Sequence, residues 1–297
     1  MSTPLEAVPF DPRLVQLRRR RLGRDRGAIT RHVVINVFVV IILLPLVWVL
    51  IMSVKSLPDA MSGDFWPTHF DFTHYGYVLH NIATLPINLF NSIYVTVSTV
   101  IITSVCAVLA GYALVHLRPR GGGVVVAILL VSLYFPVRVV SLIAIYQIQH
   151  FLHLINITSG LILPYVTLNL AISVLIMRSM FQLVPRELIE AATIDGAGPW
   201  RTLWKVGLPM VRNGLVVVFL VNFITAWGEY LFCMTLTNDQ DKRTIAVVLA
   251  TVEGGLGQWS WPDLAAVYII VVAPAIIAFG CAQKLFFKGL NEGALKG

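Results

Sequence analysis

Arg138 points most directly to chemistry, because it lies inside a long apolar stretch at 124–147. A charged side chain at membrane depth is costly, and such residues usually face a cavity or a partner charge. A guanidinium in a cavity would bind an anionic or hydroxyl-rich solute through several hydrogen bonds. Two structural roles are the alternatives: the side chain reaches the outer membrane interface, or it pairs with Glu229.

Other polar and aromatic side chains accompany Arg138 in apolar stretches. Aromatic rings and a few polar side chains are the groups that surround a bound sugar. The Asn and Glu side chains can instead form hydrogen bonds between helices, and the Trp can belong to the aromatic belt at the membrane surface. Both interpretations remain open for the candidate substrate-path residues, which are Tyr134, Arg138, Asn169, Asn222, Trp227 and Glu229.

No residue pattern predicts a metal site, a bound cofactor or a catalytic centre on this chain. Cys106, Cys233 and Cys281 lie in apolar runs without a Cys or His at metal-binding spacing. His150 and His153 are three residues apart but lack a third ligand. The phosphate-binding pattern GxxxxGK followed by Ser or Thr is absent, so any ATP hydrolysis belongs to another polypeptide. We therefore expect no enzyme.

The composition places these residues in a membrane protein. Hydrophobic residues make up 57% of the 297 positions, charged residues make up 12%, and the mean hydropathy is +0.80. Soluble globular proteins have about 25% charged residues. The composition therefore argues against a soluble enzyme or a nucleic-acid binder in spite of the net charge of +7, and it predicts membrane lipid as the surroundings.

Six apolar stretches are long enough to cross about 30 Å of hydrocarbon. Pro136 interrupts the third, which is either a broken helix or a helix followed by a second one at the membrane interface. We predict an all-α membrane protein with six transmembrane helices at 33–54, 90–115, 124–147, 160–181, 213–236 and 264–287.

The basic residues predict the orientation of the six helices. Most of the 22 lysines and arginines precede the first stretch or follow the second, fourth and sixth. Basic residues gather on the cytoplasmic side of membrane proteins, so both termini are predicted to be cytoplasmic. The expected layout is a basic segment at 1–32, a six-helix domain at 33–287 with an external loop at 55–89 and a cytoplasmic loop at 182–212, and a cytoplasmic tail at 288–297.

The loop 182–212 has the features of a helical hairpin. Pro185 suits the first turn of a helix, and Gly196 can end that helix in the left-handed conformation. Pro199 then starts a second short helix. Ala191 and Ala192 have small side chains, so that another protein can approach the backbone of the first helix on that side. The alternative is an amphipathic hairpin that lies on the membrane surface.

The hairpin carries a family resemblance. Glu190-Ala191-Ala192, then Gly196, then Leu208-Pro209 resembles the EAA signature of permease subunits of ATP-binding-cassette importers. Phe65-Trp66-Pro67 is similar to the external-loop pattern of the carbohydrate-importing branch, and the ending looks like the tail of the smaller maltose-type permease. Two positions depart from the pattern: Arg138 stands where an uncharged residue is usual, and Gly228 stands where many relatives carry Asn.

The resemblance implies a type I importer permease fold, also called MetI-like, in the plasma membrane of a bacterium or archaeon. It implies four kinds of partner: a second permease that forms a heterodimer, two ATPase subunits that hold ATP and Mg, an extracytoplasmic solute-binding protein, and a small carbohydrate. It assigns ATPase coupling to Glu190, Ala191, Ala192, Asp195, Gly196, Ala197, Leu208 and Pro209. It makes the C-terminal tail a tether between the ATPases, with Gly289, Leu290, Lys296 and Gly297.

Two alternatives concern the cargo and the energy source. Because Arg138 is positively charged, one alternative is an anionic cargo: an anionic polyol, a sugar acid, or a sulfonated or phosphorylated sugar. An ion-coupled secondary transporter would carry several intramembrane carboxylates and an internal repeat. Only Glu229 comes near such a position and no repeat is evident, so the ATP-driven importer is favoured.

Overall fold

The computed structural model describes residues 12–134, 137–254 and 259–294, with side chains at 31–134, 140–252 and 259–281. These residues form helices and no β-strand, which confirms the all-α prediction. In chain order the elements are α1 (Pro12–Met52), α2 (Leu57–Ser62), α3 (Thr73–Asn81), α4 (Leu85–Tyr112), the π-helical turn η1 (Ala113–Leu117), α5 (Gly122–Tyr134), α6 (Val137–Phe151), the 3-10 turn η2 (Thr158–Leu161), α7 (Ile162–Gln182), α8 (Arg186–Ile194), α9 (Pro199–Thr202), the π-helical turn η3 (Leu203–Gly207), α10 (Leu208–Met210), α11 (Arg212–Trp227), α12 (Leu231–Leu236), the 3-10 turn η4 (Gln240–Lys242), α13 (Ile245–Gly254) and α14 (Trp261–Ala294).

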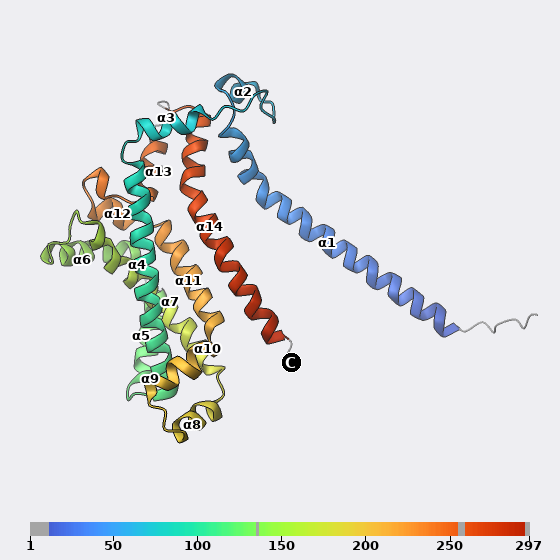
Figure 1. Ribbon diagram of the computed structural model, residues 1–297, viewed down its shortest axis with the longest axis vertical. Helices are drawn as coiled ribbons and strands as arrows, with labels where there is room; N and C mark the ends of the chain where they lie inside the picture. The colour runs from blue at the N-terminus through green and yellow to red at the C-terminus, as the bar shows by residue number, and fades with distance from the viewer. Residues whose placement is uncertain (1–11, 135–136, 255–258, 295–297) are drawn as a thin grey trace, which may run out of the picture.

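Helices α4, α7 and α11 form the centre of the bundle, and α14 packs against α11 (Figure 1). Helices α4 and α7 approach each other closely at Gly111 of α4. A Cβ atom there would lie 2.9 Å from the Cβ of Met177 and from the backbone nitrogen of Arg178, both on α7. Small residues let transmembrane helices come this close, so that van der Waals contacts hold them together.

Four helical segments of the described residues are long and apolar enough to cross a membrane: Arg31–Met52, Leu85–Leu117, Thr158–Gln182 and Trp261–Cys281. They overlap the predicted first, second, fourth and sixth spans. A fifth results if Pro199–Met210 and Arg212–Trp227, which meet at an angle of 78°, count as one.

The predicted third and fifth spans are interrupted. An interruption of the third is part of both alternatives given for it, whereas the break in the fifth corrects the prediction of a continuous helix there. The third is divided into α5, of 13 residues, and α6. Between them lies Pro136, outside the described residues, and a proline lacks the N–H that a helix interior needs. The fifth stops when α11 ends at Trp227, and α12 begins at Leu231. The prediction of six spans therefore rests on two interrupted segments.

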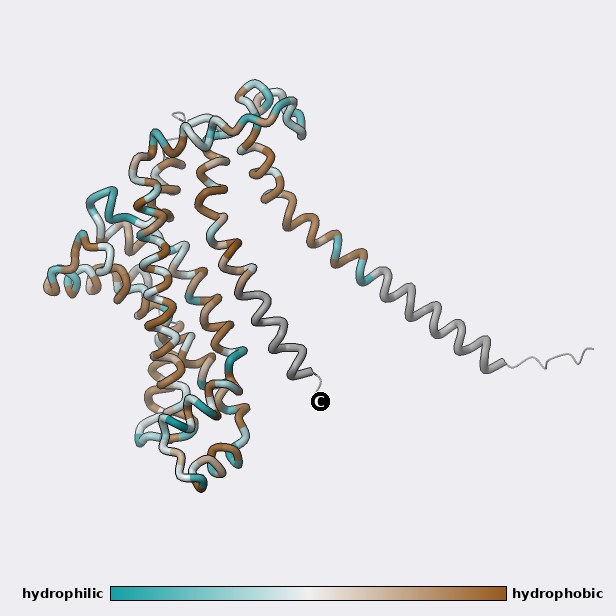
Figure 2. The backbone as a smooth tube through the Cα atoms, viewed as in Figure 1, coloured by the Kyte–Doolittle hydropathy of each residue, from teal (hydrophilic) through white to brown (hydrophobic). Residues whose placement is uncertain are grey.

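Helix α1 diverges from the rest of the bundle (Figure 1). Its large apolar side chains from Val33 to Leu50 are largely uncovered, with Ile42 66% exposed, and Figure 2 colours most residues of this half of the helix as hydrophobic. At its C-terminal end the chain is held, since Ser53 and Lys55 are buried. Lys55 donates a hydrogen bond to the backbone carbonyl of Asp64 and lies over the Trp48 ring.

The free ends of α1 and α14 both point toward the end of the bundle that carries α8 and α9, opposite α2 and α3 (Figure 1). Gly289 and Leu290, predicted as part of a tail, belong to α14, which continues to Ala294. Lys296 and Gly297 lie outside the described residues.

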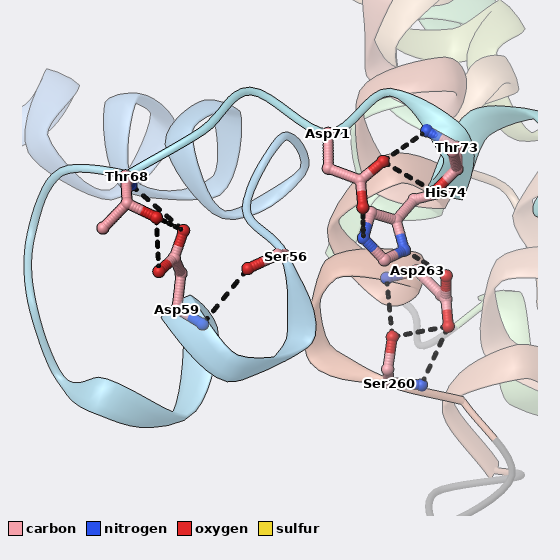
Figure 3. Close-up of polar contacts among 8 residues, drawn as sticks. All are labelled: Ser56, Asp59, Thr68, Asp71, Thr73, His74, Ser260 and Asp263. Atoms are coloured by element: carbon pink, nitrogen blue, oxygen red, sulfur yellow. Dashed lines mark hydrogen bonds and ion pairs between the residues drawn. The ribbon is translucent and has the colours of Figure 1, made fainter.

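A buried His–Asp pair ties α3 to the start of α14 (Figure 3). The Nδ1 atom of His74 lies 2.7 Å from Oδ1 of Asp263, with both side chains about nine-tenths buried. The other Asp263 oxygen accepts hydrogen bonds from the backbone N–H and the hydroxyl of Ser260. Asp71 lies on the far side of the ring, 3.8 Å from Nε2. The pair joins segments that are 189 residues apart in sequence.

Replacing His74 with Leu should loosen α3 from α14, because Asp263 then loses one of its buried partners. A hydrogen bond to a charged group contributes about 1.5–3 kcal/mol, so amide exchange in Thr73–Asn81 should accelerate at least tenfold. Hydrogen–deuterium exchange of the full chain in a nanodisc measures this. The matched control is His80→Leu on the exposed side of the same helix; equal acceleration in both variants would refute a specific role of the pair.

The loop before α3 should loosen in acid. The pKa of Asp59 is lowered because its carboxylate accepts hydrogen bonds from Thr68, and that of Asp71 because its carboxylate accepts hydrogen bonds from Thr73. A lowered pKa means that the stabilisation is present above the unfolded-state pKa and is lost as the pH falls through the folded-state pKa. Exchange of residues 57–72, corrected for the intrinsic rate, should therefore rise below about pH 4. In Thr68→Val the contribution of Asp59 to this rise should disappear.

Candidate functional site

The hairpin of α8 and α9 turns at Gly196, as the sequence predicts. Gly196 has a φ of +78°, in the left-handed region. Its N–H donates to the carbonyl of Thr193, and the N–H of Ala197 donates to the carbonyl of Ala192. These two bonds form a Schellman motif, in which a glycine ends the helix without steric cost. Asp195 to Ala197 therefore make a defined corner at one end of the bundle (Figure 1).

Apolar side chains project from this corner. Ile194 is 86% exposed, Trp200 is 65% exposed and Leu188 is 44% exposed. Ala191 is exposed beside them, while Ala192 is half-buried. Such a cluster next to a helix side without bulk has the features of a surface that a partner protein covers.

The second arm of the hairpin is anchored in the bundle. Leu203 is buried in one apolar cluster with Tyr112 of α4 and Phe181 of α7. Gly207 lies against the same two rings, because a Cβ atom there would be 3.3 Å from Phe181 and 3.7 Å from Tyr112. Leu208 is half-buried and Pro209 is exposed just before the 78° bend into α11. A displacement of the corner would therefore be passed to α4, α7 and α11.

Glu190 lies away from the corner, five residues before Asp195, which is about one and a half turns of α8. It lines a small pocket of about 180 Å³ together with His116 and Arg118, which follow α4, and with Arg186 and Ile189 of α8. The first arm of the hairpin thus faces the segment after α4.

Two candidates for a substrate path, Asn169 and Asn222, are buried between α7 and α11. The Oδ1 atom of Asn169 accepts a hydrogen bond of 2.5 Å from the Thr225 hydroxyl. The Nδ2 atom of Asn222 donates to Ser173 Oγ at 2.9 Å and to the backbone carbonyl of Val218. Both side chains therefore cross-link helices within this chain.

Ser173 and Thr225 complete these links and are not among the residues predicted from the sequence. Ser173 follows Asn169 by four residues and Thr225 follows Asn222 by three, so each pair lies on one face of its helix. A polar stripe at helical spacing on an otherwise apolar helix was the signal that could have found them.

Trp227 and Glu229 lie at the break after α11. Trp227 is 9% exposed, stacks on Phe223 with ring centroids 5.6 Å apart, and donates its indole N–H to the carbonyl of Val271 on α14. The buried carboxylate of Glu229 accepts hydrogen bonds from the backbone N–H groups of Phe232 and Cys233, at the start of α12. Glu229 therefore caps a helix, as carboxylates often do at the positive end of the helix dipole.

The last two path candidates lie on either side of the interruption between α5 and α6. Tyr134 is 89% exposed at the end of α5. Arg138 lies in the first turn of α6, and its side chain is outside the described part of the chain. The structure thus brings together Asn169 and Asn222, through their helices, but not Tyr134 with Trp227 or Glu229.

A larger groove of about 680 Å³ runs along α4, α11 and α14. Its walls include Val97 and Ile101 of α4, Phe219 and Trp227 of α11, and Ile277 of α14. The single side-chain hydroxyl among its described lining residues is Ser104. A sugar needs several hydrogen-bonding groups, so this chain alone does not provide a sugar site there.

Within the described ranges, no three His, Cys, Asp or Glu side chains are close enough to hold a metal ion.

Comparison with known proteins identifies the family of this chain. A family model described as the inner membrane component of binding-protein-dependent transport systems matches residues 103–292. The diacetylchitobiose uptake system permease protein of Streptomyces coelicolor is 30% identical over 95% of this chain and 93% of its own length. The sulfoquinovosyl glycerol transport system permease protein of Agrobacterium fabrum is 28% identical, covering 91% of this chain and 95% of its own.

A solved structure has the same architecture. It belongs to a bacterial ABC transporter involved in the import of the acidic polysaccharide alginate, and the matched chain is 26% identical with a TM-score of 0.75. The match covers 94% of this chain and 100% of that one. Because the family model spans most of the sequence, including the hairpin, this protein belongs to the inner-membrane permease subunits of sugar-importing ATP-binding-cassette transporters, which are transport subunits and not enzymes.

Proposed function

We propose that this chain forms, with a second permease, the membrane path of an ATP-driven importer for a carbohydrate that an external solute-binding protein delivers. The observation that carries this proposal is the α8–α9 hairpin, with an exposed apolar corner and an arm anchored against α4 and α7. Two ATPase subunits complete the assembly. They hold ATP and Mg, which supply the energy, while this chain contributes the surface on which one of them acts.

The hairpin lies in the cytoplasm in this proposal, and both termini lie on the same side. The direction of α1 and α14 toward the α8 end supports this orientation, as does the excess of basic residues there (Figure 1). The chain then crosses the plasma membrane of its cell six times, with α5–α6 and α11–α12 as interrupted spans. The layout retains the segments 1–32, 33–287 and 288–297 as cytoplasmic start, membrane domain and cytoplasmic end.

Coupling proceeds through contacts that differ between two states. The corner residues Asp195, Gly196 and Ala197 enter a cleft of the ATPase, with Ala191 and Ala192 allowing close approach. Movement of the ATPases displaces the corner, and the anchored arm through Leu208-Pro209 transmits the displacement to α11. A ligand-driven change of this kind requires different contact energies in the inward- and outward-facing states. Gly289 and Leu290, near the end of α14, and the following residues reach the ATPases as a tether.

The apolar groove along α4, α11 and α14 faces the second permease in this proposal. An apolar surface of this size between membrane helices suits helix packing, while a sugar would take its hydrogen bonds from both permeases. Tyr134, Arg138 and the groove residue Trp227 are our candidates on this chain for contact with the solute. Asn169, Asn222 and Glu229 support the path by holding its helices.

An anionic sugar is the second candidate for the cargo. Two observations favour it: Arg138 lies near the start of α6, and two related transporters are named for sulfoquinovosyl glycerol and for the acidic polysaccharide alginate. A guanidinium near the path would bind a carboxylate or sulfonate through paired hydrogen bonds.

Replacing Ile194 with Ser should weaken the binding of the ATPase to this permease. Burial of an Ile side chain contributes about 1.5–3 kcal/mol, so the affinity should fall at least tenfold. Gly196→Asp should act in the same direction, because its backbone occupies the left-handed region. Co-purification of the ATPase at graded concentrations and ATP-dependent uptake into membrane vesicles measure both effects. Leu183→Ser is the control, since this exposed leucine precedes the hairpin; normal binding in both hairpin variants contradicts the coupling role.

Replacing Arg138 with Gln separates the two candidate cargos. If the cargo is anionic, uptake of a uronic-acid disaccharide should fall about tenfold, while uptake of the corresponding neutral disaccharide stays constant. Initial uptake rates in proteoliposomes that contain the whole transporter measure this. Lys242→Gln, which changes an outer charge paired with Asp241, is the control. Equal rates for both sugars before and after the change remove Arg138 from the path.

A further inference from the structure

The 180 Å³ pocket beside α8 has the composition of a binding site. It lies where η1 leaves the apolar segment Leu85–Leu117 and meets the first turns of α8. Its six lining residues are Val115, His116, Arg118, Arg186, Ile189 and Glu190. Basic residues therefore come from two elements that are otherwise separated by α5, α6 and α7.

The carboxylate and the guanidinium groups of this pocket lack hydrogen-bond partners within the described chain, whereas the His116 ring has a hydrogen bond with the backbone of Phe181. Neither Arg118 nor Arg186 forms a hydrogen bond or an ion pair there through its guanidinium, and Glu190 forms none through its carboxylate. The Nε2 atom of His116 is buried without a hydrogen-bond partner. Buried polar atoms nearly always have a partner, so this ring nitrogen is available to a water molecule or a ligand that enters the pocket.

The charge of the pocket favours an anion. Two guanidinium groups against one carboxylate leave a net positive charge, even with His116 neutral. Guanidinium groups bind phosphate through paired, charge-assisted hydrogen bonds. The negative charge of Glu190 lowers the affinity of the pocket for any anion. Its carboxylate would accept a hydrogen bond from a hydroxyl group next to the phosphate. The volume admits a phosphate with a glycerol-sized substituent but no nucleotide or oligosaccharide.

The depth of the pocket indicates where such a phosphate comes from. Val115 and His116 belong to the last turns of the apolar segment, and Arg118 follows it directly. In the orientation proposed above, this is the boundary between the hydrocarbon and the cytoplasm, where the headgroups of inner-leaflet lipids lie. Basic pockets between helices on this side of a membrane bind anionic headgroups.

We propose that this pocket binds a phosphate ester, supplied by the headgroup of an anionic phospholipid or by a soluble phosphate. A phosphate held by Arg118 and Arg186 bridges the end of α4 to the first arm of the coupling hairpin. The anion content of the membrane then affects how firmly the hairpin is held. The inference rests on the proposed orientation for its lipid source, whereas phosphate binding itself is measurable without transport.

The test uses the assembled transporter in nanodiscs of phosphatidylcholine alone or with added phosphatidylglycerol. Native mass spectrometry counts phosphatidylglycerol molecules retained on this chain, and added inorganic phosphate is the soluble probe in the phosphatidylcholine discs. Arg118→Gln and Arg186→Gln should each weaken retention about tenfold, as expected for the loss of a hydrogen bond to a charged group. Arg120→Gln, two residues along the same loop and outside the pocket, is the matched control and should retain the wild-type value.

A second variant keeps the charges and fills the space. Ile189→Phe should reduce retention as strongly as the loss of an arginine, so a folding defect of one arginine variant does not decide the result. Loss of phosphatidylglycerol identifies the lipid source, and loss of inorganic phosphate binding identifies the soluble source; either supports the site. Equal retention by all variants and the control overturns it. Reduced ATPase co-purification in the arginine variants with unchanged phosphate retention also overturns it, because the pocket then accepts an ATPase side chain.

Discussion

Backbone groups cannot remain unpaired where water is absent, and this constraint governs how the interrupted helices of the protein are built. After α11 ends, the carboxylate of Glu229 accepts hydrogen bonds from the backbone N–H groups of Phe232 and Cys233, in the first turn of α12. Glu229 is 5% exposed, so no solvent would replace these bonds. In the sequence, Glu229 is a candidate substrate ligand. In the structure its carboxylate has a structural role, because it pairs with backbone groups where a membrane helix is interrupted.

Hydrogen bonds between buried polar side chains likewise hold α7 against α11. Thr225 donates to Asn169, and Asn222 donates to Ser173, so two hydrogen bonds cross an interface that is otherwise apolar. In lipid such bonds contribute about 0.6 kcal/mol on average, and close packing supplies most of the attraction. Gly111 provides that packing between α4 and α7. The three central helices are therefore packed as one unit.

Local signals made the hairpin predictable, whereas the helix breaks and the substrate path required tertiary information. Gly196 and Pro199 act on their own turns of chain, and the structure has the corner where they indicate it. The apolar stretch, averaged over neighbouring residues, continues through Gly228 and Glu229. The average therefore gives no sign that the Glu229 carboxylate caps α12. Whether Asn222 faces a neighbouring helix or a cavity depends on how α7 packs beside it, and one sequence contains no direct record of that packing.

Two apolar surfaces of the chain are left uncovered by its own described residues. The apolar side chains of α1 from Val33 to Leu50 have few contacts within the chain, and the 680 Å³ groove between α4, α11 and α14 has almost no polar group. Lipid can cover α1, because its tails are as apolar as Leu. A polar solute crossing the membrane, however, needs hydrogen-bonding groups that this groove lacks. In the proposed importer a second permease faces this groove, and the polar groups of the path then come from that partner and from residues near Arg138.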